Sequence, residues 1–148
     1  MATTIKDEPL GRLIYHMAQD LGRFAEKILN PFDLTLEQLH ILKTMPRDGG
    51  MTQKDIGAAV GKTPANMTRI LDRLEEKSLI QRQRDPKDRR ATLVFMTENG
   101  KKTAEKVTDI FESFSIQFQK GVTDQELRII RAAFAKMSAN LRKIDAKP

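Results

Sequence analysis

The chain has 148 residues and a formal net charge of +6, with 39% hydrophobic and 31% charged residues, so we expect one folded domain rather than a disordered chain. The absence of cysteine excludes disulfides, thiolate catalysis and cysteine-based redox sensing. No apolar run approaches the ~18 residues of a membrane helix and no signal-peptide segment is recognisable, so we expect a cytoplasmic protein without membrane contact.

The first predicted elements are two helices. Apolar residues between positions 10 and 29 recur at the spacing of one helix face for about five turns. Pro31 ends this helix, because the residue before a proline avoids the helical region. Thr35 and Gln38 have the spacing of a capping box, which begins a second helix that runs to about Met45.

A short helix and a longer one follow, joined by a turn. Thr52 is placed as the N-cap of the short helix, which ends near Gly61. Thr63 caps the longer helix, which extends to about Lys77 and has proline at its first position, where a missing N–H costs nothing. Gly57 has no Cβ and lets the two helices approach closely. This arrangement is typical of a helix-turn-helix motif.

A β-hairpin is predicted after the longer helix. Residues 79–84 form the first strand, 85–88 a tight turn, and 91–96, rich in β-branched and aromatic residues, the return strand. Two long helices complete the chain, one capped by Thr97 and the other beginning after Thr123 with a heptad pattern of apolar residues. The predicted fold class is mainly α with a small β-hairpin wing: a winged helix-turn-helix with long terminal helices.

Positive charge concentrates in the helix-turn-helix and the hairpin. Residues 61–90 contain nine Lys or Arg and five Asp or Glu, and nine minus five gives +4 of the total +6. The second helix of such a motif enters the DNA major groove, and a narrow basic ribbon fits the minor groove, where negative potential attracts arginine. Asn66 and Arg69 are suited to adenine and guanine, and Asp88 is expected to orient a neighbouring arginine. The predicted DNA-contacting residues are Thr63, Pro64, Ala65, Asn66, Thr68, Arg69, Arg73, Arg82, Arg84, Lys87, Asp88, Arg89 and Arg90.

The terminal helices carry more apolar surface than the small winged-helix core can cover. Part of each stripe packs within the chain, and we expect the remainder to be buried against the same helices of a second copy in a two-fold interface. The predicted dimer-interface residues are Leu10, Leu13, Ile14, Met17, Leu127, Ile130, Phe134, Met137, Leu141 and Ile144.

Four segments, residues 51–57, 63–77, 85–90 and 96–100, resemble the MarR family of bacterial regulators. The most specific part is the Asp-x-x-Asp-x-Arg hairpin, followed by a strand and a helix that starts with Thr-x-x-Gly. The resemblance extends over nearly the whole chain. It implies a homodimer that binds a pseudo-palindromic operator, often as a repressor released by a small molecule, with Asp88 and Arg90 as the wing pair and Arg90 in the minor groove.

One residue departs from the family pattern. Ser78 stands where the family usually has glycine after the recognition helix, which here is the longer helix from Thr63 to about Lys77. The sequence therefore leaves open how that helix ends and in which direction the hairpin begins.

The resemblance also implies an effector pocket between the dimerisation helices and the DNA-binding lobe, for a phenolic or other lipophilic small molecule. The candidate lining residues are Tyr15, His16, His40 and Phe111. Each of them also fits an ordinary surface or core position, and this alternative stays open.

The predicted organisation is a single MarR-type domain over residues 1–148, with a DNA-binding lobe at 35–97 and dimerisation helices at 8–30 and 98–144. The predicted function is sequence-specific regulation of transcription on double-stranded DNA, at the nucleoid. Two alternatives remain: a non-specific architectural DNA-binding protein, and a winged-helix adaptor that binds an acidic protein surface. No Gly-rich phosphate loop, nucleophile elbow or zinc-ligand spacing occurs, so we expect no enzyme activity, cofactor or metal.

Overall fold

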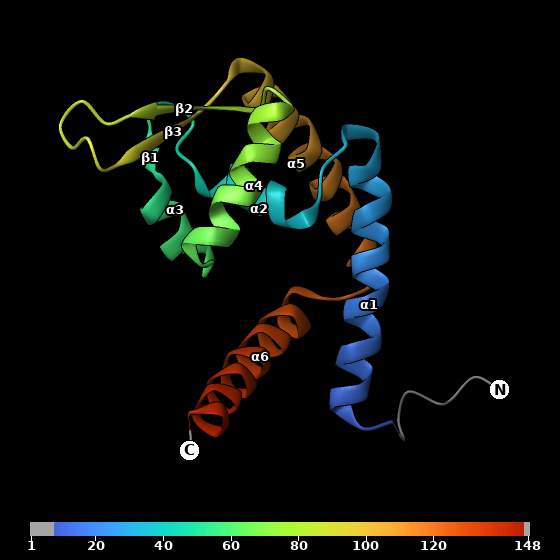
Figure 1. The fold of residues 1–148 in the computed structure, drawn as a ribbon. Coiled ribbons are helices and arrows are strands. Elements are labelled where there is room, and N and C mark those ends of the chain that lie inside the picture. The colour runs from blue at the N-terminus through green and yellow to red at the C-terminus, as the bar shows by residue number, and fades with distance from the viewer. Residues whose placement is uncertain (1–7, 147–148) are drawn as a thin grey trace. The chain divides into compact units, whose positions relative to one another are not determined.

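The computed structural model describes residues 8–146, so the outer limits of the predicted domain, 1 and 148, lie outside the described residues (Figure 1). The elements in chain order are α1 (Leu10–Leu29), the 3-10 helix η2 (Asn30–Phe32), α2 (Leu36–Thr44), β1 (Met51–Thr52), α3 (Gln53–Val60), α4 (Pro64–Glu76), β2 (Ile80–Arg84), β3 (Thr92–Met96), α5 (Glu98–Phe118) and α6 (Asp124–Asp145). The predicted fold class, mainly helical with a small β wing, is confirmed. No helix between residues 8 and 146 is long and apolar enough to cross a membrane.

Side-chain caps begin the helices of the helix-turn-helix where the sequence predicts them. The Thr35 hydroxyl accepts a hydrogen bond from the Gln38 amide, and the Gln38 side chain accepts one from the Thr35 amide, which completes the capping box of α2. Thr52 and Thr63 each accept a hydrogen bond from the amide three residues on, at the starts of α3 and α4. These local bonds explain why the predicted boundaries are correct to within one or two residues.

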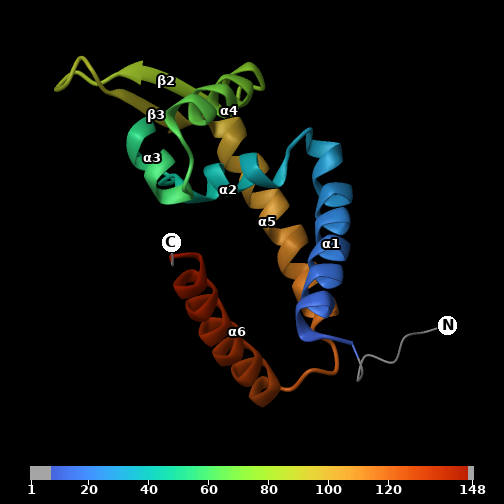
Figure 2. The same cartoon turned by 60° about the horizontal axis from the view of Figure 1, so that its bottom comes forward.

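The three strands form one antiparallel sheet in the order β1-β3-β2. β2 and β3 are the predicted hairpin, in a register that begins with Ile80 opposite Met96. In both views of the fold this hairpin extends beyond α3 (Figures 1 and 2). β1 was not predicted: it pairs Met51 with Val94, and a two-residue strand is too short to carry an alternating hydrophobic pattern.

Buried apolar side chains join the helix-turn-helix to the hairpin. Four residues of α4 with helical spacing form its inner face. A Cβ built on Gly57 of α3 would lie 3.1 Å from the Met67 Cγ and 3.3 Å from the Lys62 carbonyl oxygen, so the close approach predicted for this glycine is confirmed. The largest fully buried side chains are Leu29, Ile41, Leu42, Ile56, Met67, Leu71, Leu74, Ile80, Val94 and Val107.

The end of α4 meets the start of β2 and the start of α5 at a single junction. Ser78 has a φ of 56°, so serine adopts the left-handed backbone that glycine more often supplies after a helix. The Leu79 amide donates to the Leu74 carbonyl at 3.0 Å, as in a Schellman motif. Thr97 then donates its amide to the Leu79 carbonyl and its hydroxyl to the Ser78 carbonyl, at 3.1 and 2.7 Å, so the start of α5 is bonded to the end of α4.

The chain divides into two compact units, Met1–Ile110 and Phe111–Pro148, with the boundary inside α5. In the second unit, the rings of Phe114 and Phe118 stack with their centroids 5.6 Å apart. α6 has no buried residue, although it carries the heptad pattern of apolar side chains. The core of this protein is therefore contributed by the first unit.

Gly100 is predicted to be indispensable to the junction between α4 and α5. A Cβ at this position would lie 2.0 Å from the Leu79 carbonyl oxygen, which is backbone and already accepts a hydrogen bond. We expect Gly100→Ala to lower the free energy of unfolding by about 2–3 kcal/mol, measured by urea denaturation.

The matched control is Gly22→Ala in α1, where the added Cβ meets no atom within 4 Å apart from its chain neighbours and the backbone of its own helix. This change should raise the free energy of unfolding by up to about 1 kcal/mol, because alanine loses less conformational freedom in a helix than glycine. A Gly100→Ala protein as stable as the wild type would contradict the interpretation.

Candidate nucleic-acid interface

The outer face of α4 is a row of small and polar side chains above a buried apolar face. The Thr63 hydroxyl orients the first turn by accepting a hydrogen bond from the Asn66 amide at 3.4 Å. Aligned peptide dipoles give this helix start a partial positive charge, which favours phosphate. The exposed residues in this region that were predicted to contact DNA are Thr63, Pro64, Ala65, Asn66, Thr68, Arg69 and Arg73.

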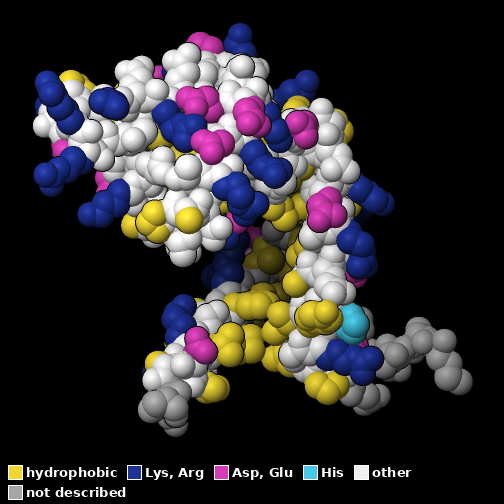
Figure 3. All heavy atoms as spheres, viewed as in Figure 1, with side chains coloured by type: hydrophobic (Ala, Val, Ile, Leu, Met, Phe, Trp, Pro, Cys, Tyr) yellow, Lys and Arg dark blue, Asp and Glu magenta, His cyan; other side chains and the backbone are white. Residues whose placement is uncertain are grey.

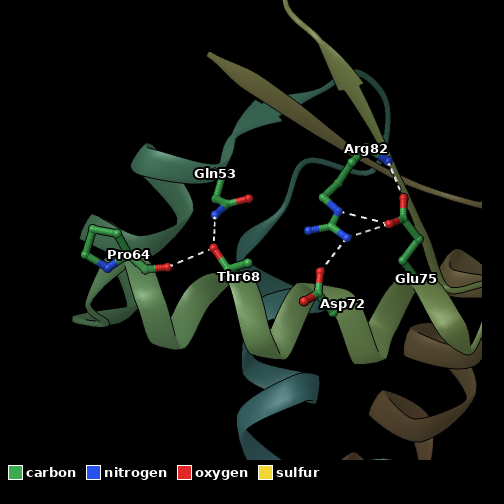
Figure 4. A network of polar contacts seen from close by, with 6 residues as sticks. All are labelled: Gln53, Pro64, Thr68, Asp72, Glu75 and Arg82. Carbon is green, nitrogen blue, oxygen red and sulfur yellow. Dashed lines mark hydrogen bonds and ion pairs between the residues drawn. The ribbon is translucent and has the colours of Figure 1, made fainter. Parts of the chain in front are cut away.

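Thr68 is held by a contact that the sequence did not reveal. Its hydroxyl donates to the Pro64 carbonyl oxygen at 3.1 Å and accepts from Nε2 of Gln53, at the start of α3, at 2.9 Å (Figure 4). Gln53 therefore connects the two helices of the motif on their outer side. A lone glutamine fifteen residues earlier in the sequence carries no pattern that predicts this contact.

The turn of the hairpin is shaped by two aspartates. The Asp85 Oδ1 accepts a hydrogen bond from the Lys87 amide at 2.8 Å, and the Asp88 Oδ1 accepts one from the Arg90 amide at 2.9 Å. Asp88 thus bonds the backbone amide of Arg90, whereas the sequence suggested a bond to an arginine side chain. The exposed cations of the wing are Arg84, Lys87, Arg89 and Arg90, and dark-blue side chains gather at this end of the lobe in Figure 3.

Arg82 differs from the other basic residues of the hairpin because it points back to α4. Its Nε and Nη2 donate to Oε2 of Glu75 at 3.0 and 2.6 Å, and Nη2 also donates to Oδ1 of Asp72 at 2.6 Å (Figure 4). Its backbone amide donates to Oε1 of Glu75 at 3.0 Å. The bonds from Arg82 lower the pKa of Glu75, and those from Glu75 raise the pKa of Arg82, so both groups stay charged near neutral pH.

Two hollows border these elements. One, of about 580 Å³, lies between the helix-turn-helix and the wing, and its lining includes Gln53, Pro64, Met67, Asp88 and Arg90. The other, of about 480 Å³, runs along α4, and its lining includes Arg69, Asp72, Arg73 and Glu76. Residues of α4 therefore line both hollows.

The four candidate effector residues do not line these hollows. Tyr15 and His16 are exposed neighbours on α1 whose ring centroids lie 5.7 Å apart, and His40 is exposed on α2. Phe111 is half-buried on α5, in the second unit. A third hollow, of about 290 Å³ between α2 and the first half of α5, also lacks them. Among the described residues, no group of three or more His, Asp or Glu could hold a metal ion.

None of the ten residues predicted for a dimer interface is buried within one chain. Leu13, Ile14, Leu127 and Met137 are half-buried, and the remaining six are exposed. Leu141 and Ile144 on α6 keep 67% and 68% of their surface accessible. Figure 3 shows hydrophobic side chains on the surfaces of both α1 and α6.

Comparison with known proteins gives the same fold. MepR of Staphylococcus aureus in complex with DNA is 28% identical, with a TM-score of 0.80, and the match covers 90% of this chain and 99% of that one. A mutant MarR of E. coli in complex with operator DNA is 25% identical, with a TM-score of 0.76 and coverage of 91% and 99%. A second crystal structure of MepR, described as a transcription regulator of the Staphylococcus aureus multidrug efflux pump MepA, is 28% identical. Its TM-score is 0.73, and the match covers 90% of this chain and 99% of that one.

The family model for the MarR family matches residues 34–92, which run from two residues before α2 to the first residue of β3. This segment contains the whole helix-turn-helix and the turn of the wing, and the structural matches to MepR and MarR on DNA cover 90% and 91% of the chain. Residues 34–92 are thus similar in sequence to the MarR family, and the chain is similar in fold to the winged-helix transcription regulators MarR and MepR.

Proposed function

We propose that this protein is a dimeric, sequence-specific DNA-binding repressor that a small molecule releases from its operator. The observation that carries the proposal is that one lobe presents both an exposed, polar recognition helix and a basic hairpin. The relatives crystallised on DNA, MepR and MarR, have the same fold over about nine-tenths of this chain. A protein with this function acts on the chromosome, in the cytoplasm.

In the proposed complex, α4 enters the major groove with its first turns foremost. Asn66 is suited to pair with adenine and Arg69 with guanine, because each side chain can form two hydrogen bonds to those base edges. The wing lies along the adjacent minor groove, where Arg90 is attracted by the negative potential. Arg73, Arg84, Lys87 and Arg89 supply phosphate contacts, which add affinity without sequence preference.

The dimer is supported by the apolar surface of the terminal helices. α6 presents Ile130, Phe134 and Leu141 on one heptad stripe, and all three are exposed in the single chain. A two-fold interface buries the same stripe on both copies. Two recognition helices in such a dimer are expected about 34 Å apart, one turn of DNA, which matches a pseudo-palindromic operator.

Release requires a ligand that prefers a dimer whose recognition helices do not match the operator spacing. A coupling free energy of about 1–3 kcal/mol, typical of allosteric proteins, changes DNA affinity by roughly 5- to 150-fold. The residues proposed to contact such a ligand, Tyr15, His16, His40 and Phe111, are inferred from the family likeness. A phenolic or other lipophilic compound is the expected class of effector.

Two substitutions test the DNA-binding proposal. The DNA used is the duplex that the wild-type protein enriches most strongly from a pool of genomic fragments. Arg69→Ala should reduce discrimination at one base pair by about 1–3 kcal/mol. Arg90→Ala should weaken binding to all duplexes and lower the slope of log affinity against log salt by about 0.9. Fluorescence anisotropy over a salt series measures both quantities.

The control is Lys27→Ala in α1, which removes the same charge from an exposed site outside α4 and the wing. A wild-type affinity that responds to salt but not to sequence would favour the architectural alternative. An affinity that responds to neither would contradict DNA binding and favour the protein adaptor.

Sedimentation tests the dimer. The wild type should sediment as twice its 16.8 kDa chain mass at micromolar concentration. Phe134→Glu should weaken association at least about tenfold, because a charge replaces an aromatic side chain in the buried stripe. Ile129→Glu is the matched control: Ile129 is exposed on the same helix but lies outside the heptad stripe. A wild-type species of 16.8 kDa would refute the dimer.

A further inference from the structure

Two carboxylates lie on the helix that is proposed to face DNA. Asp72 stands between Arg69 and Arg73 in the sequence of α4 and lines the same hollow with them, so it belongs to the same outer surface. Its side chain is 48% exposed. Glu75 is one turn on and is 39% exposed. DNA carries a negative charge every ~1.7 Å along its axis, so uncompensated carboxylates on this surface oppose binding.

Arg82 occupies the position from which one cation reaches both acids. It extends from β2 to bond Asp72 and Glu75 at 2.6 Å each through Nη2, and Glu75 again through Nε. Only 22% of its side chain is accessible, so Arg82 is turned toward the protein. Its fork geometry and permanent charge suit two carboxylates, and lysine cannot reproduce this arrangement.

We propose that Arg82 is a positioning residue for DNA binding: it neutralises the Asp72 and Glu75 carboxylates and fixes the wing against the recognition helix. This inference rests on the proposed function. Arg82 then contributes to affinity without touching DNA, by removing a repulsion from the surface that Arg69 and Arg73 present. The interaction joins the two elements that are proposed to bind DNA, so it also couples the wing to α4.

The charge neutralisation has a specific consequence in a double-mutant cycle. In Arg82→Gln, Asp72 keeps its charge but loses its partner, and binding to the selected genomic duplex should weaken at least about fivefold. Adding Asp72→Asn should recover about threefold or more of that loss. The same Asp72→Asn change in the wild type should give a clearly smaller gain, because Arg82 already neutralises the carboxylate there.

Two matched variants separate this effect from general charge and stability effects. Glu76 lines the same hollow but takes part in no ion pair found between residues 8 and 146. Glu76→Gln should therefore raise DNA affinity by the same factor in the wild-type and Arg82→Gln backgrounds. Arg84→Gln removes a wing cation two residues on, and Asp72→Asn should not rescue it. Arg82→Lys should bind DNA more weakly than the wild type. Urea denaturation of each variant measures the folded fraction, and affinities are compared for folded protein.

The outcomes distinguish the two proposals. Rescue by Asp72→Asn in the Arg82→Gln background, exceeding its effect in the wild type, supports the positioning role. Equal effects of Asp72→Asn in both backgrounds would overturn it and leave Arg82 as a direct DNA contact, while DNA binding itself stands. An Arg82→Gln protein that binds as tightly as the wild type would also overturn it. A wild type that binds no duplex would overturn the proposed function and this inference together.

Discussion

The direction in which the wing leaves α4 depends on a junction of three residues. Ser78 reverses the backbone in the left-handed region, Leu79 bonds back to the last turn of α4, and Thr97 bonds to both of their carbonyl groups. Left-handed serine carries a conformational cost that glycine avoids, so the bonds around it must over-determine the geometry. The absence of a Cβ at Gly100 makes room for this arrangement.

The junction matters for the proposed function because the two elements proposed to face DNA meet at it. α4 ends there and β2 begins there, so a change of a few degrees at Ser78 is carried along the whole hairpin to its basic turn. The Arg82 bonds to Glu75 and Asp72 add a second attachment between the same two elements, farther along the strand. A single attachment leaves the hairpin free to rotate relative to α4. Two attachments fix the angle between the hairpin and α4. The lobe is therefore pre-organised, which in the proposed complex reduces the ordering cost of binding DNA.

Much of the fold could be predicted because its signals are local. Threonine caps and a proline at the first helical position each act within a few residues, and the structure confirms them. Gly57 of α3 is also confirmed, at its close approach to Met67 in the next helix. The elements that sequence reasoning missed depend on contacts between distant residues. β1 is too short to show periodicity, and it exists because Met51 lies beside Val94 in the sheet.

The candidate site shows the same division between local and distant signals. The exposed row on α4 follows from helix periodicity, and the basic turn follows from composition. The bond from Gln53 to Thr68 and the bonds from Arg82 to Asp72 and Glu75 required coordinates. Sequence alone grouped Arg82 with the other cations of the hairpin, because strand alternation does not say which carboxylates lie beneath one face. The heptad pattern of α6 predicts an interface but not the partner that covers it.

The side chains that stabilise the fold differ from those that are proposed to stabilise the dimer. Among residues 8–146, the fully buried side chains all belong to the unit Met1–Ile110, so the geometry of α4 and the wing is determined within one copy. α6 buries none of its apolar residues in that way, and in the proposed dimer its order depends on a second copy. In the proposed dimer, a ligand that acts on the terminal helices alters the spacing of the two lobes while each lobe keeps its core. The free energy needed is that of an interface rearrangement, 1–3 kcal/mol in typical allosteric proteins, which is less than the cost of disrupting a domain core.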